Sequence, residues 1–205
     1  MTRELIVTGL DNVIFEGDGL LRGMYKGIYS YGFLEGYPAP RRKSNMIKHI
    51  GQAITGRTVK SIEPLVSRVS SRTVSRVNHR ALKRLNDFPP SSHEIVAMSS
   101  APDFLVRKAL DLLMSQTGTL FSNAHILASS FVIEDGCYTG EYQLLDKPKA
   151  IAGLLRDVGT STIKLGLIDS EAELEWAREH CEAIETFTPK FKLARHLENL
   201  DVAST

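Results

Sequence analysis

Three apolar runs in the sequence each lead into polar residues that suit a phosphorylated ligand. These are Gly9 and Asp11 after residues 5–8, Ser99 and Ser100 after residues 94–98, and Asp169 after residues 162–168, with Lys147 one expected helix before the third run. Aspartate oxygens bind hard cations such as Mg²⁺, whereas serine hydroxyl and lysine ammonium groups donate to phosphoryl oxygens. The residue types therefore predict phosphate binding, provided that the fold brings the ends of the three runs together.

The three runs have the pattern of buried parallel strands. Residues 5–8 are apolar and partly β-branched, which is typical of a strand covered on both faces. From residue 94 onward expected strands alternate with expected helices, and this alternation predicts an α/β fold with a doubly wound, Rossmann-like parallel sheet. Ligands bind at the carboxyl edge of such sheets. We therefore expect Asp11, Ser99 and Asp169 at one site.

The stretch between the first two expected strands contains only helical patterns. The expected helices span residues 20–36, 44–56 and 64–86, the last beginning at Pro64. Such a stretch is too long for a simple crossover, so we expect an all-helical insertion, or cap, over the carboxyl end of the first strand. The predicted division is a core of residues 1–19 and 87–205 and a helical cap of residues 20–86.

The remaining patterns belong to the predicted core. Asp135-Gly136 is a turn signal and predicts a hairpin. Lys147-Pro148 begins a helix, and residues 171–184 read as another helix. A short element and a final helix are expected over residues 186–200.

The charge of the chain is divided unevenly. Residues 41–84 hold twelve Lys or Arg and one acid, a net charge of +11, whereas the rest of the chain carries −10. Five arginines recur every fourth residue and would form one stripe on a single helix: Arg68, Arg72, Arg76, Arg80 and Arg84. Three interpretations remain open, namely a basic cap on an acidic core, an anionic ligand, and nucleic acid or an acidic membrane surface. Residues 41–84 contain no Phe, Tyr or Trp, which disfavours base stacking.

In this order, the motifs resemble the haloacid dehalogenase (HAD) superfamily, specifically its phosphoserine-phosphatase-like branch with a helical cap. The four matching segments are Leu-Ile-Val-Thr-Gly9-Leu-Asp11-Asn-Val13, Ile-Val-Ala-Met-Ser99-Ser-Ala-Pro, Lys147, and Ile168-Asp169-Ser170-Glu171-Ala172-Glu173. The resemblance spans nearly the whole chain. It implies that Ser99, Ser100 and Lys147 bind phosphate. It also implies that Asp169 and the backbone carbonyl of Asp11 hold Mg²⁺, with Glu173 behind them.

The first motif departs from the family at its most important position. The family's first aspartate is the covalent nucleophile and a Mg²⁺ ligand, and Gly9 stands in its place. Asp11 matches the second aspartate, the general acid/base, and Val13 replaces the usual threonine. Because glycine has no side chain, the nucleophile position is vacant.

We therefore expect a HAD-like protein that binds phosphate or a small phosphorylated molecule but is impaired or inactive as an aspartyl-phosphate phosphatase. Mg²⁺ binding should be weak or optional, since one carboxylate ligand is missing. The alternative is a phosphomonoester hydrolase in which water attacks directly with Asp11 as acid/base. Arg68, Arg72, Arg76 and Arg80 would bind anions on the cap, either a polyanion or a protein partner.

The composition bounds the cellular setting. No apolar run approaches the roughly 18 residues of a membrane helix, and the first residues lack the apolar region of a signal peptide. The two cysteines, Cys137 and Cys181, have no metal-like spacing. We expect a reducing, cytoplasmic location.

Overall fold

The computed structural model of the chain describes residues 4–17, 19–35, 42–118, 120–160 and 162–187. Six strands form one sheet in the order β4-β3-β2-β1-β5-β6. Their bounds are β1 Glu4–Gly9, β2 His93–Pro102, β3 His125–Glu134, β4 Cys137–Gln143, β5 Ile163–Ile168 and β6 Cys181–Thr186. Neighbouring strands are parallel except β3 and β4, which are antiparallel. The predicted α/β fold with a doubly wound parallel sheet is confirmed.

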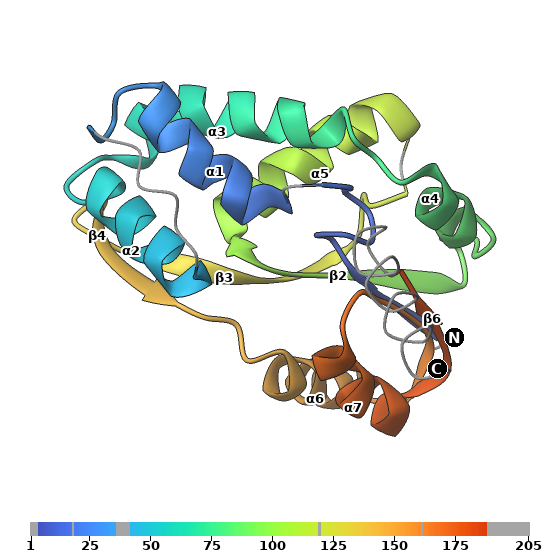
Figure 1. The fold of residues 1–205 in the computed structure, drawn as a ribbon. Coiled ribbons are helices and arrows are strands. Elements are labelled where there is room, and N and C mark those ends of the chain that lie inside the picture. The colour runs from blue at the N-terminus through green and yellow to red at the C-terminus, as the bar shows by residue number, and fades with distance from the viewer. Residues whose placement is uncertain (1–3, 18, 36–41, 119, 161, 188–205) are drawn as a thin grey trace, which may run out of the picture.

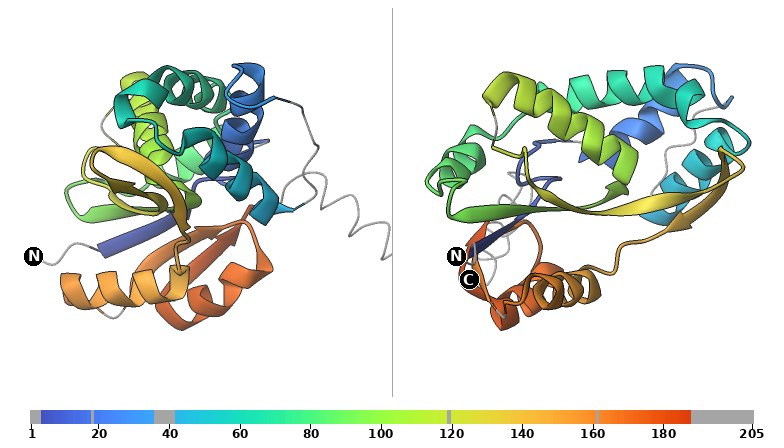
Figure 2. Two further views of the ribbon diagram at one scale, coloured as in Figure 1. Left: turned by 90° about the vertical axis from the view of Figure 1, so that its left-hand side faces the viewer. Right: turned by 180° about the vertical axis from the view of Figure 1, so that it is seen from behind.

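Helices cover both faces of this sheet (Figure 1). Their bounds are α1 Gly19–Ser30, α2 Lys43–Ile54, α3 Val59–Val74, α4 His79–Asn86, α5 Asp103–Thr117, α6 Lys147–Val158 and α7 Glu171–His180. Helices α5, α3 and α1 lie on one side of the sheet and α6 and α7 on the other, as the turned views in Figure 2 also show. Strand β1 packs on both sides, since Ile6 joins the cluster of α1, α3 and α5, whereas Leu5 and Val7 join that of α6 and α7.

The described residues between β1 and β2 form helices α1 to α4 and the connections between them, so that two helices stand where the last single helix was expected. The chain leaves the helical path after α3, and Val77 forms a β-bridge with Phe15. The side chain of Asn78 then caps α4 by accepting hydrogen bonds from the backbone N–H groups of Arg80 and Ala81, at 3.1 and 3.3 Å. Thr58 caps α3, so that Pro64 lies inside this helix and does not begin it. The single expected helix over 64–86 is therefore wrong.

This break divides the expected arginine stripe. Arg68 and Arg72 lie on α3, Arg76 lies in the connection, and Arg80 and Arg84 lie on α4. The guanidinium of Arg80 stacks on Phe187, 5.4 Å from the ring centroid. Arg84 pairs with Glu185 and Asp87. The five arginines thus face different surroundings, and the prediction of one continuous stripe is wrong.

The end of the described chain also differs from expectation. The helix expected over 171–184 stops at His180, and residues 181–186 form β6, which pairs in parallel with β5. The backbone hydrogen bonds offered by the open edge of β5 outweigh the helical pattern. The elements expected over 186–200 lie mostly outside the described residues.

The hairpin formed by β3 and β4 packs against helix α2 beside the carboxyl end of β2. Asp135 and Gly136 form its turn with φ of 49° and 76°, the left-handed values of a two-residue hairpin loop, so the predicted hairpin is confirmed. Helix α2 lies against β4 (Figure 1). The connection that follows α2 is bonded to the hairpin, from Gly56 N to Tyr138 O at 2.8 Å and from Tyr138 N to Arg57 O at 2.9 Å. Among the described residues, no helix is both long and apolar enough to span a membrane.

Candidate functional site

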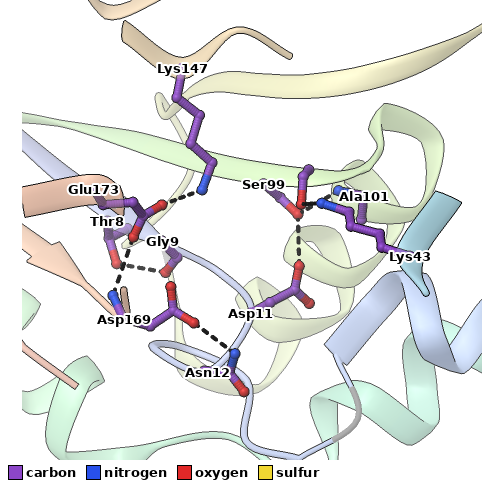
Figure 3. Close-up of polar contacts among 11 residues, drawn as sticks. Thr8, Gly9, Asp11, Asn12, Lys43, Ser99, Ala101, Lys147, Asp169 and Glu173 are labelled. Carbon is purple, nitrogen blue, oxygen red and sulfur yellow. Dashed lines mark hydrogen bonds and ion pairs between the residues drawn. The ribbon is translucent and has the colours of Figure 1, made fainter. Parts of the chain in front are cut away.

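A pocket of about 150 Å³ lies at the carboxyl edge of the sheet, where β1, β2 and β5 end. We call it the edge pocket. Its lining residues are Gly9, Leu10, Asp11, Asn12, Met98, Ser99, Ser100, Lys147, Asp169 and Glu173. The structure thus brings together every site residue that the sequence suggests outside the arginine set. Figure 3 shows the side chains of Asp11, Lys147 and Asp169 around the space in front of Gly9.

A tight loop after β1 presents two polar side chains to this pocket. The backbone N–H groups of Ile14 and Phe15 both bond to Leu10 O, at 3.0 and 2.8 Å, and this closes the loop. Asn12 adopts a φ of 63°, a left-handed conformation that asparagine tolerates better than most residues. Its Nδ2 donates to Asp169 Oδ2 at 2.7 Å, which ties the loop to the end of β5.

Both carboxylate oxygens of Asp11 already accept hydrogen bonds. Oδ1 accepts from the backbone N–H of Leu20 at 2.7 Å, at the start of α1, and Oδ2 accepts from Ser99 Oγ at 3.0 Å. The first contact needs glycine at position 19, because a Cβ there would lie 2.6 Å from Oδ1. Asp11 is therefore fixed between the helix terminus and the end of β2.

The end of β2 carries a bulge that directs the two serines. The pairing of β2 with β3 shifts between Ser99 and Pro102, although the sequence suggests that the strand ends at residue 98. The buried Ser99 Oγ accepts from Ala101 N at 2.9 Å while it donates to Asp11. The carbonyl of Ser100 accepts a hydrogen bond from Tyr142.

The positive charge of Lys147 is compensated inside the protein. Lys147 begins α6, whose N-cap is Asp146, and its Nζ pairs with the buried carboxylate of Glu173. Glu173 also accepts from Asp169 N at 3.2 Å. Burial raises the pKa of Asp169, and the nearby charge of Glu173 raises it further, whereas the hydrogen bond from Asn12 lowers this pKa. Lys147, Glu173 and Asp169 form one connected cluster in the lining of the pocket.

Position 9 offers only backbone to the pocket. Gly9 ends β1, and a Cβ added there would lie 3.1 Å from Val13 Cγ2. The preceding Thr8 is fully buried and is not part of the pocket lining, as strand alternation predicts. The neighbouring side chain on β1 therefore does not reach the pocket beside Gly9.

Sequence reasoning missed three residues at this site. Lys43, the first residue of α2, reaches Ser100 Oγ at 2.5 Å, and Tyr142 approaches the same serine from β4. Neither residue follows a strand end, so nothing in the local sequence marks them. Asn12 could have been identified from the sequence, because it is a polar residue that directly follows Asp11 in the loop after the first apolar run.

The arginines lie away from the edge pocket. Arg68, Arg72 and Arg76 line a second pocket of about 70 Å³ between α1 and α3, which also contains Lys26 and Glu16. We call it the arginine pocket. The guanidinium of Arg68 lies 4.8 Å from the centroid of the Tyr31 ring. In the described ranges, Arg68, Arg72 and Arg76 form no ion pair with a carboxylate.

The edge pocket contains only part of the ligand set for the Mg²⁺ that the family resemblance implies. Protein-bound Mg²⁺ takes oxygen ligands in octahedral geometry, usually from one or two carboxylates together with water and phosphate. The pocket lining includes Asp169, but Gly9 offers no side chain and both carboxylate oxygens of Asp11 already accept hydrogen bonds. No group of three or more His, Cys, Asp or Glu side chains in the described part of the chain is arranged to hold a metal. The residues do not fit the family's metal site.

Comparison with known proteins supports the fold. No protein-family model and no curated protein matches the sequence. A protein of unknown function from Bordetella pertussis Tohama I has a TM-score of 0.60 and 12% identity, over 90% of this chain and 99% of that one. Cytosolic 5'-nucleotidase IIIB bound to cytidine has a TM-score of 0.56 and 13% identity, over 89% and 72%. A substrate-bound phosphoserine phosphatase complex has a TM-score of 0.53 and 12% identity, over 93% and 89%. The chain therefore shares its Rossmann-like fold with these solved structures.

Proposed function

We propose that the edge pocket binds inorganic phosphate or a small phosphorylated molecule and does not turn it over through an aspartyl-phosphate. The observation that carries this proposal is Gly9, which ends β1 beside the pocket without a side chain. Around it stand groups that suit phosphate oxygens, namely the hydroxyls of Ser99 and Ser100 and the ammonium of Lys147. The fold likeness to phosphatases supports a phosphorylated ligand.

The vacancy at position 9 has a large expected effect on rate. Loss of a covalent nucleophile costs up to about 10⁶-fold in kcat in a well-studied hydrolase, and the remaining rate comes from binding and electrostatics. The carboxylate of Asp11 belongs to a different position of the loop and is held by Leu20 and Ser99. We infer that the chain is a binding protein, such as a sensor or a partner-binding module, and that its binding of Mg²⁺ is weak or optional.

Slow hydrolysis by direct water attack is the second candidate. It is favoured by the position of Asp11 at the pocket, from which a carboxylate acts as a general base towards water. A water molecule must compete with Ser99 or Leu20 for that carboxylate, because both oxygens already accept hydrogen bonds. In this case Asp11→Asn abolishes the slow turnover and leaves phosphate binding in place.

The remaining parts of the proposal concern the cap and the setting of the protein. We infer that residues 20–86 act as a cap, and that the arginine pocket binds anionic groups of a polyanion or protein partner. The lack of carboxylate partners for Arg68, Arg72 and Arg76 in the described residues supports this role. Cys137 and Cys181 are both free thiols, which agrees with a reducing, cytoplasmic location.

The test of phosphate binding is calorimetric titration of the protein with inorganic phosphate. Removing Lys147 alone would leave the buried carboxylate of Glu173 without its counter-ion. The informative variant is therefore Lys147→Met/Glu173→Gln, which removes both partners of the ion pair. We expect at least a tenfold loss of affinity in that variant and a smaller loss in Ser100→Ala. The exposed Ser122, outside the edge pocket, provides the control Ser122→Ala. Equal affinities in all four proteins would contradict the proposed site.

A further inference from the structure

Lys43 lies outside the lining of the edge pocket and brings an ammonium group to Ser100, which is part of that lining. It is the first residue of α2, and Figure 3 shows its side chain extending towards Ser99. Its Nζ donates to Ser100 Oγ at 2.5 Å. The packing of α2 on β4 and the bonds that follow this helix hold α2 beside the pocket. The fold therefore holds the backbone of α2 in place, and the exposed side chain of Lys43 reaches Ser100 from it.

Lys43 differs from Lys147 in having no acidic partner. Lys147 is paired with the buried Glu173, whereas Lys43 makes no ion pair with a carboxylate in the described residues. Burial lowers the pKa of Lys43, and the charge of Lys147 lowers it further, while Asp11 and Asp169 act in the opposite direction. The exposed ammonium of Lys43 has no carboxylate counter-ion in the described residues, so an anion that enters the pocket gains an ion pair with it.

The missing carboxylate changes the charge that a phosphate meets. The family site implied by the first motif needs a divalent cation to bring phosphate close to clustered carboxylates. In this chain Gly9 removes one carboxylate, Lys147 compensates Glu173, and Asp11 is hydrogen-bonded to Leu20 and Ser99. A phosphate that enters the pocket therefore meets less negative charge than in the family site. The ammonium of Lys43, which has no carboxylate partner in the described residues, can attract it.

We propose that Lys43 supplies the positive charge that holds phosphate oxygens in the edge pocket, so that phosphate binds without a divalent metal. The inference rests on the proposed function. Lysine binds phosphate as a point charge on a flexible stem. The Nζ of Lys43 leaves Ser100 Oγ for the ligand, and the Ser100 hydroxyl becomes a second donor to it. Helix α2 thereby links ligand binding to the hairpin and the helical segment.

The test is calorimetric titration of inorganic phosphate in EDTA and, separately, in millimolar Mg²⁺. The variants are Lys43→Met, Lys43→Arg and the control Lys48→Met, which removes an exposed lysine from the same helix. We expect the affinity of the unaltered protein to differ less than threefold between the two buffers. Lys43→Met should bind at least tenfold more weakly in EDTA, Lys43→Arg should retain most of the affinity, and Lys48→Met should bind like the unaltered protein. Equal far-ultraviolet circular dichroism and melting temperatures verify that each variant is folded.

The outcomes separate this inference from the proposed function. Binding by the unaltered protein in Mg²⁺ but not in EDTA overturns the role of Lys43 and leaves phosphate binding in place. Equal affinities of Lys43→Met and Lys48→Met in EDTA overturn it as well. Absence of phosphate binding in both buffers overturns the proposed function itself and the inference with it.

Discussion

Gly9 is tightly packed as well as unreactive. A Cβ at this position would stand 3.1 Å from Val13 Cγ2 and 3.7 Å from Leu167 O, while the backbone itself is compatible with other residues. A side chain at position 9 therefore requires Val13 to shift by a few tenths of an ångström.

This packing predicts an energetic coupling between positions 9 and 13. Gly9→Ala should destabilise the protein by about 1 kcal/mol, because overpacking costs roughly 1–3 kcal/mol and the stiffer unfolded chain returns about 0.4–1 kcal/mol. In Gly9→Ala/Val13→Ala the loss should be smaller than the sum of the two single losses, since Val13→Ala removes the contact. Urea unfolding of the four proteins measures the coupling, and additive losses would show that the contact is absent.

Gly19 leaves room for the carboxylate of Asp11 beside the start of α1. It has a φ of 66°, and an added Cβ would lie 2.6 Å from Asp11 Oδ1. Gly32 has a similar φ of 70° with nothing within 4 Å, so Gly32→Ala reports backbone strain alone. We expect Gly32→Ala to cost on the order of 1 kcal/mol and Gly19→Ala to cost clearly more, as measured by urea unfolding. Similar losses would mean that Asp11 does not depend on Gly19.

Burial predicts an unreactive thiol at the start of β6. It raises the pKa of Cys181 to about 11, so only about 0.1% of the thiol is ionised at pH 8, and the thiolate is the reactive form. In a Cys137→Ala background, iodoacetamide should alkylate folded protein at pH 8 at least 100-fold more slowly than protein unfolded in urea. The rate should rise about tenfold per pH unit towards pH 11. Equal rates at pH 8 would contradict this burial.

At the scale of elements, local sequence predicted strands β1, β2 and β5 and many helix starts, but not strand β6. The apolar run before Gly9, the Asp135-Gly136 turn and the Lys147-Pro148 helix start all depend on short-range pattern, and the structure contains each of them. The break between α3 and α4 depends on a bridge from Val77 to Phe15, 62 residues earlier in the chain. The helical periodicity of the sequence continues through residues 75–78, because a local pattern carries no information about a contact with a residue so far away in the chain.

The candidate site shows the same division. Gly9, Asp11, Ser99 and Asp169 could be found because strand ends of a parallel sheet converge at one edge. Lys43 arrives from a helix whose position depends on the hairpin, and no spacing in the sequence relates it to Ser100. Long-range packing therefore adds to the site the residue on which metal-free binding is proposed to depend.

The division of the arginines leads to a prediction for α3. Arg72 and Arg76 line the arginine pocket, whereas Lys60 and Lys83 do not. Arg72→Ala/Arg76→Ala should lower the affinity for inorganic polyphosphate at least tenfold at low salt. Lys60→Ala/Lys83→Ala, which removes the same charge, should lower it less than threefold. Fluorescence titrations between 50 and 300 mM NaCl measure both effects, and binding should weaken with salt because ions screen exposed charges. Affinity insensitive to salt, or equal loss in both variants, would contradict an anion site there.

Across the whole molecule, the opposite charges of the two regions are only partly matched by contacts. Arg84 pairs with Glu185 on β6 and with Asp87, and Lys43 reaches Ser100 on β2. The hydrophobic cluster, in contrast, runs without interruption from Ile6 on β1 through α5 to α1 and α3. Apolar packing therefore joins the helical segment to the sheet.

Turnover tests the central claim most directly, that a phosphatase-like site binds phosphate without its nucleophile. The protein, Asp11→Asn and Gly9→Asp/Val13→Ala are assayed with a panel of phosphomonoesters and Mg²⁺. Ordinary enzymes reach a kcat of about 1–10³ s⁻¹. We predict that the unaltered protein falls at least about 10⁴-fold below this range, and that Gly9→Asp/Val13→Ala gains at least a hundredfold. Turnover by the unaltered protein at ordinary rates, abolished by Asp11→Asn, would contradict the claim.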